Sequence, residues 1–427
     1  MKKVEQFLAE NRLRASDINM DQLVSLFHSE MNKGLRGETS SLRMIPTYIE
    51  ADNEFLKDTP VLAIDAGGTN FRTTLVTFRK DGSLAMEPIR NFRMPGIENE
   101  VSKKEFFDIM AGFIKPFASE TERVGFCFSY PTEIFPDKDG RLLQFCKEVQ
   151  APEVVGQSIG KSLLEALGTP GKKIVLLNDT VATLLAGKSA SFSKVYDSYI
   201  GFILGTGTNT CYIEANRNIL KTPGLDQRKS MIINIESGNF SKAPRSDLDL
   251  VFDNTTMNPG NYSFEKMFSG GYFGGLSLTI LKEAVNQNVF PIKVLEKLEG
   301  IKELAAETAN SLLENPIPGE NILASCFEGE DEMNSAKEII DNLIDRASKL
   351  VASNLAAVVL KTGKGTRPDR PVLITIEGTA FYKLHNLKAR FERYLSEFLS
   401  GDRKLYVEFT EVEQSSLIGA ALAGLID

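Results

Sequence analysis

The sequence predicts an α/β protein of two domains, and three observations support this. The chain has 427 residues, more than one hydrophobic core usually holds, so two domains are the expected number. Apolar, strand-like segments alternate with segments of helical periodicity, which is typical of an α/β layer architecture. Two strand–turn–strand units share the tripeptide Gly-Thr-Asn, at 68–70 and 207–209, an offset of 139 residues (209 minus 70) that indicates a duplicated α/β unit.

The composition disfavours several classes of protein. With 42% hydrophobic and 25% charged residues, the chain is typical of a folded soluble protein and not of a disordered or membrane protein. A net charge of −8, a pI near 5.3 and the lack of a Lys/Arg block argue against nucleic-acid binding. Residues 1–6 lack the apolar core of a signal peptide, so we expect a cytoplasmic protein with no membrane partner.

Cysteine and histidine usage argues against two kinds of site. The few residues of these types are scattered without metal-ligand spacing, which makes a protein-ligated zinc site or a histidine-based catalytic triad improbable. They are Cys127, Cys146, Cys211, Cys326, His28 and His385.

The first half of the chain is predicted to alternate between helices and strands. Residues 1–35 have helical periodicity, with Ser16 and Asp17 available as caps. The other predicted elements are a strand, turn and strand at 61–78, a helix at 106–117, a strand at 124–129, a loop at 136–150, a helix at 153–167, a strand at 174–177 and a helix at 179–188.

The turn within residues 61–78 is a candidate phosphate-binding site. It contains Asp65, Gly67, Gly68, Thr69 and Asn70. The two glycines let backbone amides approach an anion, the Thr and Asn add side-chain donors, and the aspartate can hold a hydrated Mg²⁺. Gly-Gly between strands is also common turn chemistry, so this stretch alone supports a plain hairpin equally well.

The second half begins with a similar unit and becomes mostly helical. Residues 199–213 again read as a strand, a Gly-rich turn and a strand, and the two turns could grip a nucleotide triphosphate between domains. The other expectations are a polar stretch of poor periodicity at 221–259, a helix at 264–268, a helical block at 276–360, strands at 371–376 and 405–409, and a small-residue helix at 415–425.

A series of segments in this chain resembles the hexokinases, within the two-domain actin-like ATPase (ribonuclease H-like) fold. The segments follow the family's order, cover essentially the whole chain and occur once each, as in a one-unit hexokinase. They are 31–35 with 44–47, 65–72, 128–131, 177–183, 205–211, 258–260 with 264–266, 378 with 382–384, and 419–422.

The resemblance implies a fold and a reaction. Two α/β domains would close an interdomain cleft on the sugar, the small domain being 58–178 plus 413–427 and the large one 1–57 plus 179–412. The reaction would be ATP-dependent phosphorylation of a hexose at its 6-hydroxyl, with glucose as the first candidate and mannose or fructose as further ones. ATP and Mg²⁺ are the implied cofactors, the metal being held by the ATP phosphates with no direct protein ligand and with Asp65 acting through water.

The resemblance also assigns residues. Asp179 matches the general base that accepts the proton of the sugar hydroxyl, and Lys147 joins it as a catalytic residue. From the residues alone, Asp179 reads first as a helix cap after a buried strand. The substrate-binding set is Ser129, Tyr130, Cys146, Lys147, Asn178, Asp179, Asn209, Glu236 and Glu265. The nucleotide set is Asp65, Gly67, Gly68, Thr69, Asn70, Arg72, Thr206, Gly270, Gly378 and Thr379, with a structural ion pair as the alternative for Arg72.

Three departures from the family pattern bear on sugar preference. Cys146 stands where the family usually carries a Thr that bonds sugar, the loop 148–155 is shortened, and Ser237 stands where eukaryotic-type members usually carry a Trp. Two other readings stay open, a sugar-binding regulator without turnover and a chaperone- or filament-type ATPase of the same superfold. The protein is expected to be a monomer or a homodimer.

Overall fold

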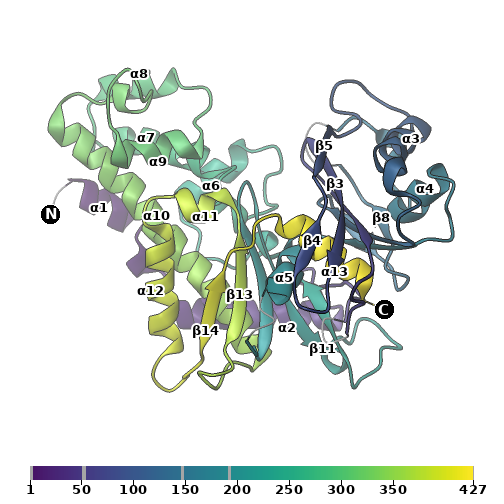
Figure 1. Cartoon of the computed structure of the whole chain (residues 1–427). Helices are drawn as coiled ribbons and strands as arrows, with labels where there is room; N and C mark the ends of the chain where they lie inside the picture. The colour runs from purple at the N-terminus through teal and green to yellow at the C-terminus, as the bar shows by residue number, and fades with distance from the viewer. Residues whose placement is uncertain (1–2, 51–53, 146–148, 191–193, 427) are drawn as a thin grey trace.

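The structure, a computed structural model, describes residues 3–50, 54–145, 149–190 and 194–426. Its described strands form two six-stranded sheets that lie in two lobes of the molecule (Figure 1), and a two-stranded ribbon. Sheet I has the order β1 (Ile45–Pro46), β12 (Ser230–Asn234), β11 (Thr208–Ala215), β10 (Ser198–Leu204), β13 (Val372–Glu377), β14 (Val407–Thr410). Sheet II has the order β4 (Leu84–Met86), β3 (Asn70–Phe78), β2 (Val61–Gly67), β6 (Arg123–Phe128), β9 (Lys173–Leu177). Its sixth strand, β5 (Arg90–Arg93), also pairs with β3. The two-stranded ribbon consists of β7 (Thr132–Ile134) and β8 (Gly140–Leu142).

Each sheet contains one of the two predicted hairpins. β2 and β3 are antiparallel and close at Gly67 opposite Asn70, and β10 and β11 close at Leu204 opposite Thr208. In sheet II the strands β2, β6 and β9 are parallel, and in sheet I so are β10, β13 and β14. The carboxyl ends of several strands therefore meet at one edge of each sheet, which is where open α/β sheets bind ligands.

The helices form the outer layers and fill the space between the sheets. α3 and α4 lie on the lobe of sheet II, while α10 packs with α2 and α12 in the other lobe (Figure 1). The α-helices of the described chain are α1 (Lys3–Glu10), α2 (Met20–Arg36), α3 (Lys103–Ile114), α4 (Ile159–Ala166), α5 (Asp179–Ala190), α6 (Asp247–Thr255), α7 (Phe273–Asn286), α8 (Ile292–Glu299), α9 (Ala306–Glu314), α10 (Gly329–Thr362), α11 (Thr379–Lys383), α12 (Leu387–Leu399) and α13 (Ser415–Leu425).

Two helices, α5 and α13, lie side by side at the centre, where the sheets meet (Figure 1). α13 packs on β2, β6 and β9 of sheet II, and α5 packs on β10 and β13 of sheet I. Small residues permit this approach, since a Cβ on Gly419 would lie 2.0 Å from the Ala182 carbonyl oxygen and one on Gly125 would lie 1.7 Å from that of Ala420. A continuous apolar cluster across these helices joins the two sheets.

The N-terminal segment is two helices and not one. α1 ends at Glu10 and α2 begins at Met20, with Arg12 between them in the left-handed region at φ 54°. The predicted caps Ser16 and Asp17 are wrong for α2, because Asn19 caps it by accepting the backbone N–H of Gln22. Both helices bury their apolar faces in one core, so the helical spacing of apolar residues continues on both sides of the break and the sequence predicted a single helix.

Four further expectations about elements are corrected. The polar stretch 221–259 contains β12 and α6, the latter begun by a capping box in which Ser246 and Asp249 bond reciprocally. The predicted helix 153–167 is a 3₁₀ turn followed by α4, because Gly156 turns the chain at φ 84°. The segment 264–268 forms only a 3₁₀ turn at Glu265–Met267. The predicted loop 136–150 contains β8.

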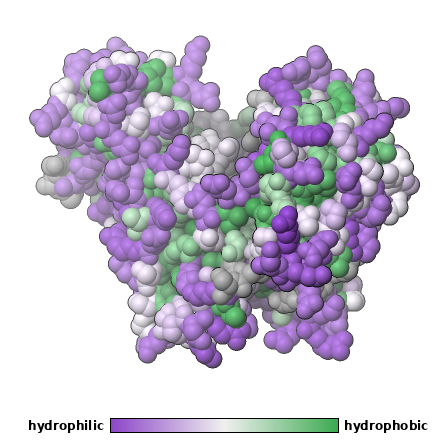
Figure 2. Space-filling view, in the orientation of Figure 1, coloured by the Kyte–Doolittle hydropathy of each residue, from purple (hydrophilic) through white to green (hydrophobic). Residues whose placement is uncertain are grey.

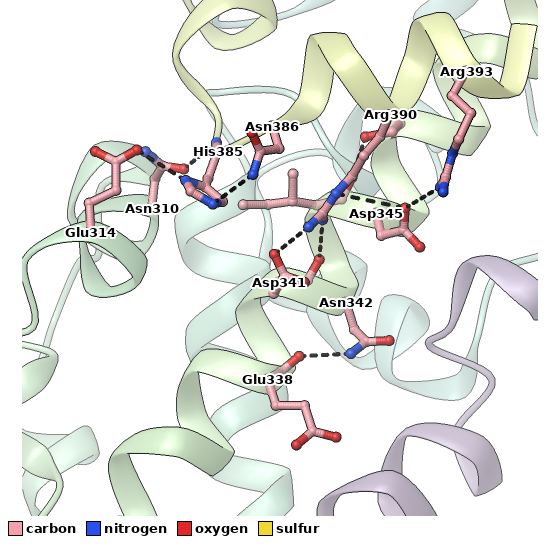
Figure 3. Close-up of polar contacts among 12 residues, drawn as sticks. Asn310, Glu314, Glu338, Asp341, Asn342, Asp345, His385, Asn386, Arg390 and Arg393 are labelled. Carbon is pink, nitrogen blue, oxygen red and sulfur yellow. Dashed lines mark hydrogen bonds and ion pairs between the residues drawn. The ribbon is translucent and has the colours of Figure 1, made fainter. Parts of the chain in front are cut away.

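Polar contacts anchor the corner between α11 and α12. Asn310 on α9 accepts the backbone N–H of His385 at 2.7 Å and donates to the Lys383 carbonyl at 3.1 Å. Arg390 on α12 donates to the Asp341 carboxylate of α10 at 2.6 Å, and Figure 3 shows these groups along one seam. The seam supports α11, which begins at a predicted nucleotide residue, Thr379.

No helix in the described parts of the chain is both long enough and apolar enough to span a membrane.

Candidate active site

The carboxyl ends of β2, β6 and β9 collect two of the predicted carboxylates. Asp65 on β2 lies opposite Cys127 on β6, and Cys127 lies opposite Leu177, the last residue of β9. The chain continues at once through Asn178 to Asp179, where α5 begins. Burial raises the pKa of the Cys127 thiol, and the charges of Asp65 and Asp179 raise it further, so both carboxylates lie near this sulfur.

The first hairpin is held in shape by its neighbours. Gly68 has φ 59°, a conformation that favours glycine. The Tyr130 hydroxyl donates to the Gly68 carbonyl at 2.8 Å, and the Ser129 N–H donates to the Ala66 carbonyl at 3.0 Å. The predicted residues Ser129 and Tyr130 therefore lie against the predicted phosphate turn.

Arg72 forms the ion pair that was the alternative for this residue. Its Nε donates to Asp65 Oδ2 at 2.9 Å, and its Nη2 contacts the same oxygen. A third nitrogen, Nη1, donates to Gln414 Oε1 at 2.9 Å. The guanidinium thus orients the Asp65 carboxylate at the hairpin.

The second Gly-rich turn assembles the other predicted nucleotide residues. The Gly270 N–H donates to the Gly205 carbonyl at 2.8 Å, and the Thr206 carbonyl accepts from the Ser269 hydroxyl at 2.9 Å. Gly378, at φ 122°, approaches so closely that an added Cβ would lie 2.3 Å from the Leu204 carbonyl oxygen. The loops after β10 and β13 are therefore in backbone contact, with Thr206 and Thr379 exposed beside them.

The Asp179 carboxyl is chemically unusual. Burial, and then the negative charge of Glu377, raise its pKa to about 7, while hydrogen bonds from Thr180 oppose the shift. The Thr180 N–H donates to Asp179 Oδ1 at 2.7 Å and to Asn178 Oδ1 at 3.0 Å. Asn178 is therefore the residue in the cap position, and the alternative reading of Asp179 as the cap is wrong, because Asp179 is the first residue of α5. The side chain keeps partial exposure, and a carboxyl that titrates near neutrality can accept a proton from a bound hydroxyl.

A cluster of amides and carboxylates surrounds Asn209. Two backbone N–H groups, of Thr210 at 2.7 Å and Ser237 at 3.2 Å, donate to Asn209 Oδ1, which fixes the orientation of this amide. Asn209 Nδ2 then donates to Asn234 Oδ1 at 2.8 Å, to Glu236 Oε1 at 3.3 Å and to Asn178 Oδ1 at 3.4 Å. Three predicted sugar residues are therefore brought together.

Two predicted glutamates, Glu236 and Glu265, bond to this cluster and to the residue before Asn209. Glu236 has φ 60°, an uncommon conformation for this residue type that marks functional sites. Glu265 Oε2 accepts the Thr208 N–H at 2.8 Å, and its carboxylate lies close to the α-carbons of Gly207 and Gly238. Both glutamates are half-buried, so each has a face open to a ligand.

A buried hydrogen-bond network supports the residues that donate to Asn209. The Asn354 Nδ2 of α10 donates to Thr210 Oγ1 at 2.8 Å, and Thr210 Oγ1 lies 3.0 Å from Ser237 Oγ. Ser237 is fully buried, so the residue that departs from the family's Trp is part of the support for Asn209 and does not line the site.

Several residues of the site were not found from the sequence. They are Asn234, Asn354, Glu377, Gln414 and Ser415. Asn234 had a usable signal, because it is an amide inside the apolar strand Ser230–Asn234 and buried polar groups need partners. The other residues come from α10, β13 and the start of α13, and only the folded chain brings them here.

Two predicted residues, Cys146 and Lys147, lie outside the described residues. Within the described parts of the chain, no group of three or more His, Cys, Asp or Glu side chains is arranged to hold a metal ion. The described sugar-set residues other than Tyr130 are partly exposed, and the space-filling view shows a notch between the two lobes (Figure 2).

The charge of the site fits Mg²⁺ carried on a nucleotide. The negative charges of Glu377 and Asp65 both raise the pKa of Asp179, so these three carboxylates lie near one another. Arg72 balances only Asp65 by a direct ion pair. A divalent cation beside Asp65 would offset the remaining negative charge, and hard carboxylate oxygens suit Mg²⁺ directly or through water.

Comparison with known proteins identifies the family. Two family models, both described as hexokinase, match residues 3–189 and 199–426. Human Hexokinase-3 (Homo sapiens) is 31% identical over 97% of this chain, and rice Hexokinase-7 (Oryza sativa subsp. japonica) is 27% identical over 94% of this chain and 92% of its own length. The chain spans about half of Hexokinase-3, since the match covers 46% of that protein.

Solved structures agree with this assignment of the fold. The hexokinase from Schistosoma mansoni complexed with glucose has a TM-score of 0.80 at 22% identity, covering 99% of this chain and 98% of that one. Another hexokinase crystal structure has a TM-score of 0.78 at 24% identity over the same shares of the two chains. The predicted α/β, actin-like ATPase fold is confirmed. Taken with the family models, these likenesses establish that the chain belongs to the hexokinase family.

Proposed function

We propose that this protein transfers the γ-phosphoryl group of ATP to the 6-hydroxyl of a hexose, giving hexose 6-phosphate and ADP. The observation that carries the proposal is the Asp179 carboxyl, whose pKa is raised to about 7 where the loops of both sheets meet. A general base works best when its pKa lies near the working pH, because it is then largely deprotonated yet still basic.

Asp179 would accept the proton of the attacking hydroxyl. The glycine turns at 67–68 and 205–207 would hold the nucleotide phosphates. Gly270, Gly378 and Thr379 would lie along the nucleotide, since the Gly270 N–H already donates to the Gly205 carbonyl. Mg²⁺, when bound to the phosphates, would supply positive charge to the transferring group. Positioning the hydroxyl in line with the phosphoryl group is the main catalytic task of such a site.

The Asn209 cluster would recognise the sugar. The donors and acceptors for the sugar would come from Asn178, Asn209, Glu236 and Glu265, with Ser129 from the other lobe. Hexose hydroxyls are both donors and acceptors, so a mixture of amides and carboxylates suits them. Glucose is the first candidate, and mannose and fructose are retained because Cys146 and the loop that follows it differ from the family pattern.

The division into two domains is supported by which sheet each segment joins. β9 belongs to sheet II and ends at Leu177, whereas α5, two residues later, packs on sheet I. This supports a boundary between 178 and 179, and the packing of α13 on sheet II supports counting 413–427 with 58–178. Closing the two lobes on the sugar would exclude water, which is a competing nucleophile.

A coupled assay of ADP release tests the proposal. The wild-type protein is incubated with Mg-ATP and glucose, mannose, fructose or no sugar. We expect ADP release that depends on the sugar and exceeds the sugar-free rate by at least about 100-fold, because the sugar completes the site. A protein that binds glucose in calorimetry but releases no ADP with any of the three sugars would be a sugar-binding regulator instead.

Asn234 offers a test of the sugar site itself. Asn234→Ala removes the nearest acceptor of Asn209 Nδ2 and a 2.8 Å hydrogen bond from Asn234 Nδ2 to Glu236 Oε1. Losing these two hydrogen bonds costs about 1–3 kcal/mol, so we expect the KM for glucose to rise about 5- to 100-fold. Steady-state kinetics at saturating ATP measures it. Asn342→Ala is the control, since among the described residues that amide donates to the Glu338 carbonyl of its own helix (Figure 3). An equal effect in both variants contradicts the assignment.

A further inference from the structure

Two adjacent residues at the start of α13 bond to opposite sides of the site. Gln414 Oε1 accepts from Arg72 Nη1 at 2.9 Å, and Arg72 belongs to the first hairpin. The Ser415 hydroxyl donates to Glu377 Oε2, and Glu377 is the last residue of β13, directly before Gly378. One peptide unit thus connects the hairpin of sheet II with the glycine loop of sheet I.

The same Glu377 oxygen also contacts the helix that carries Asp179. Thr183 Oγ1 lies 3.1 Å from Glu377 Oε2 and 3.0 Å from the Asp179 carbonyl. Ser415 and Thr183 are almost completely buried, at 1% and 0% exposure. Hydrogen bonds to a charged acceptor are stronger and geometrically tighter than neutral ones. The hairpin, the loop after β13 and α5 therefore share one anchoring point.

The backbone conformation of Gln414 makes this double contact possible. Its φ of 57° lies in the left-handed region, which is uncommon for a residue other than glycine. Strain of this kind persists where the surroundings fix it, and it is concentrated at functional sites. Because the chain turns here, consecutive side chains reach Arg72 on one side and Glu377 on the other.

These bonds are not needed to hold α13 in place. Every residue of α13 is buried, and a Cβ on its Gly419 would lie 2.0 Å from the Ala182 carbonyl oxygen of α5. Close packing therefore fixes the helix, and loss of one hydroxyl at its first turn should leave the helix where it is. The side-chain bonds of Gln414 and Ser415 instead reach strand residues beside the two loops: Arg72 of the first hairpin, and Glu377 directly before Gly378.

We propose that Gln414 and Ser415, together called the α13 latch, are positioning residues for phosphoryl transfer. They set the hairpin at Asp65 and Arg72 relative to the loop at Gly378 and to the helix of Asp179, without contacting the sugar. The inference rests on the proposed function, because those loops are the ones that would hold the nucleotide phosphates. Small displacements of reacting groups are costly, since an error of about 1 Å can reduce the rate about 100-fold.

Ser415→Ala tests the latch. We expect kcat/KM for ATP to fall about 10- to 100-fold, with the affinity for glucose in calorimetry unchanged within about twofold, because no latch bond reaches the Asn209 cluster. Ser415→Cys keeps the shape and a weak S–H donor, so it should show a smaller loss. Gln414→Ala should show a loss of the same kind, whereas Gln414→Glu keeps an acceptor for Arg72 and should stay close to wild type.

Ser396→Ala is the control for loss of a serine hydroxyl, because in the described part of the chain this exposed hydroxyl donates to the Arg393 carbonyl within α12. A second readout needs no turnover: the affinity for a non-hydrolysable Mg-ATP analogue in the presence of glucose should weaken about tenfold in Ser415→Ala, one tenfold step being about 1.4 kcal/mol.

The outcomes separate the latch from the proposed function. If the wild type releases no ADP but Ser415→Ala still weakens analogue binding, the proposed reaction fails and the latch stands. If Ser415→Ala matches wild type in both kcat/KM and analogue affinity, the latch is wrong. It is also wrong if the melting temperature, glucose affinity and nucleotide affinity all fall together, since that pattern indicates a general loss of structure.

Discussion

An Asp179→Asn variant is expected to lose sugar-dependent ADP release by a factor of about 10² to 10⁴, the range typical of removing a general base. The amide keeps the shape of the side chain and can still accept the 2.7 Å hydrogen bond from the Thr180 N–H, so the start of α5 should be preserved. Glucose affinity measured by calorimetry should change little, because Asn178, Asn209 and the glutamates are untouched. Loss of turnover with retained sugar binding is therefore the expected pattern.

The pH dependence of the wild type gives the same assignment an independent check. The base must be deprotonated to accept a proton, and the pKa of Asp179 is raised to about 7 by burial and by Glu377. We therefore expect kcat/KM for the sugar to rise with pH and to level off above about pH 7, since this parameter reports the free enzyme. A profile flat between pH 5.5 and 8 would contradict Asp179 as the base.

The same shift predicts that Asp179 costs stability. An unfolded Asp titrates near 3.9, whereas the native carboxyl titrates at about 7, so the native state binds the extra proton between these values. The stability that the protonated carboxyl contributes is thus fully present below about pH 4 and is lost as the pH rises to about 7. Above about pH 7 the ionised Asp179 therefore lowers the free energy of unfolding. Asp179→Asn removes this penalty and should raise the free energy of unfolding at pH 8 by roughly 1–2 kcal/mol after discounting for solvent screening. The gain should shrink at pH 5; urea denaturation followed by circular dichroism measures both.

The second large effect concerns a buried ion pair outside the candidate site. Arg346 on α10 donates to both carboxylate oxygens of Asp249 on α6, at 2.7 and 2.9 Å, and both side chains are almost fully buried. Arg346→Met leaves the Asp249 carboxylate buried and unpaired, which costs about 3–5 kcal/mol of unfolding free energy. Because Asp253, one turn later on α6, accepts the Gly260 N–H at 3.0 Å, we also expect the sugar KM to rise as this loop loosens.

Two further variants show whether the charge is the cause. Arg346→Met combined with Asp249→Leu removes both charges and should recover much of the lost stability. The double variant should remain about 1 kcal/mol less stable than wild type, because Asp249→Leu also removes the capping box with Ser246. Arg390→Met breaks a partly exposed pair between Arg390 of α12 and Asp341 of α10, and it should cost no more than about 1 kcal/mol (Figure 3). Equal losses for Arg346→Met and Arg390→Met, or no recovery in the double variant, would refute this account.

The sequence by itself determined the elements whose signals are local. Alternation of apolar residues around Gly-rich turns predicted the hairpins β2–β3 and β10–β11, and the small-residue run predicted α13. The order of short motifs determined the family, because each motif occurs once and in sequence along the whole chain. Elements with weak local signals were missed: β12 and α6 lie in a polar stretch where the periodicity is short, and a left-handed turn at Arg12 divides the N-terminal helix.

The tertiary structure decided what surrounds each candidate residue. Sequence spacing could not show that Arg72 pairs with Asp65, that Asn209 donates to Asn234, that Asn354 donates to Thr210, or that Glu377 raises the pKa of Asp179. The partners in these contacts come from different strands and helices, and in two of the four they lie more than 100 residues apart along the chain. Hydrogen bonding, burial and charge interactions act through space over a few ångströms, so the chemistry of Asp179 depends on neighbours that only folding brings together.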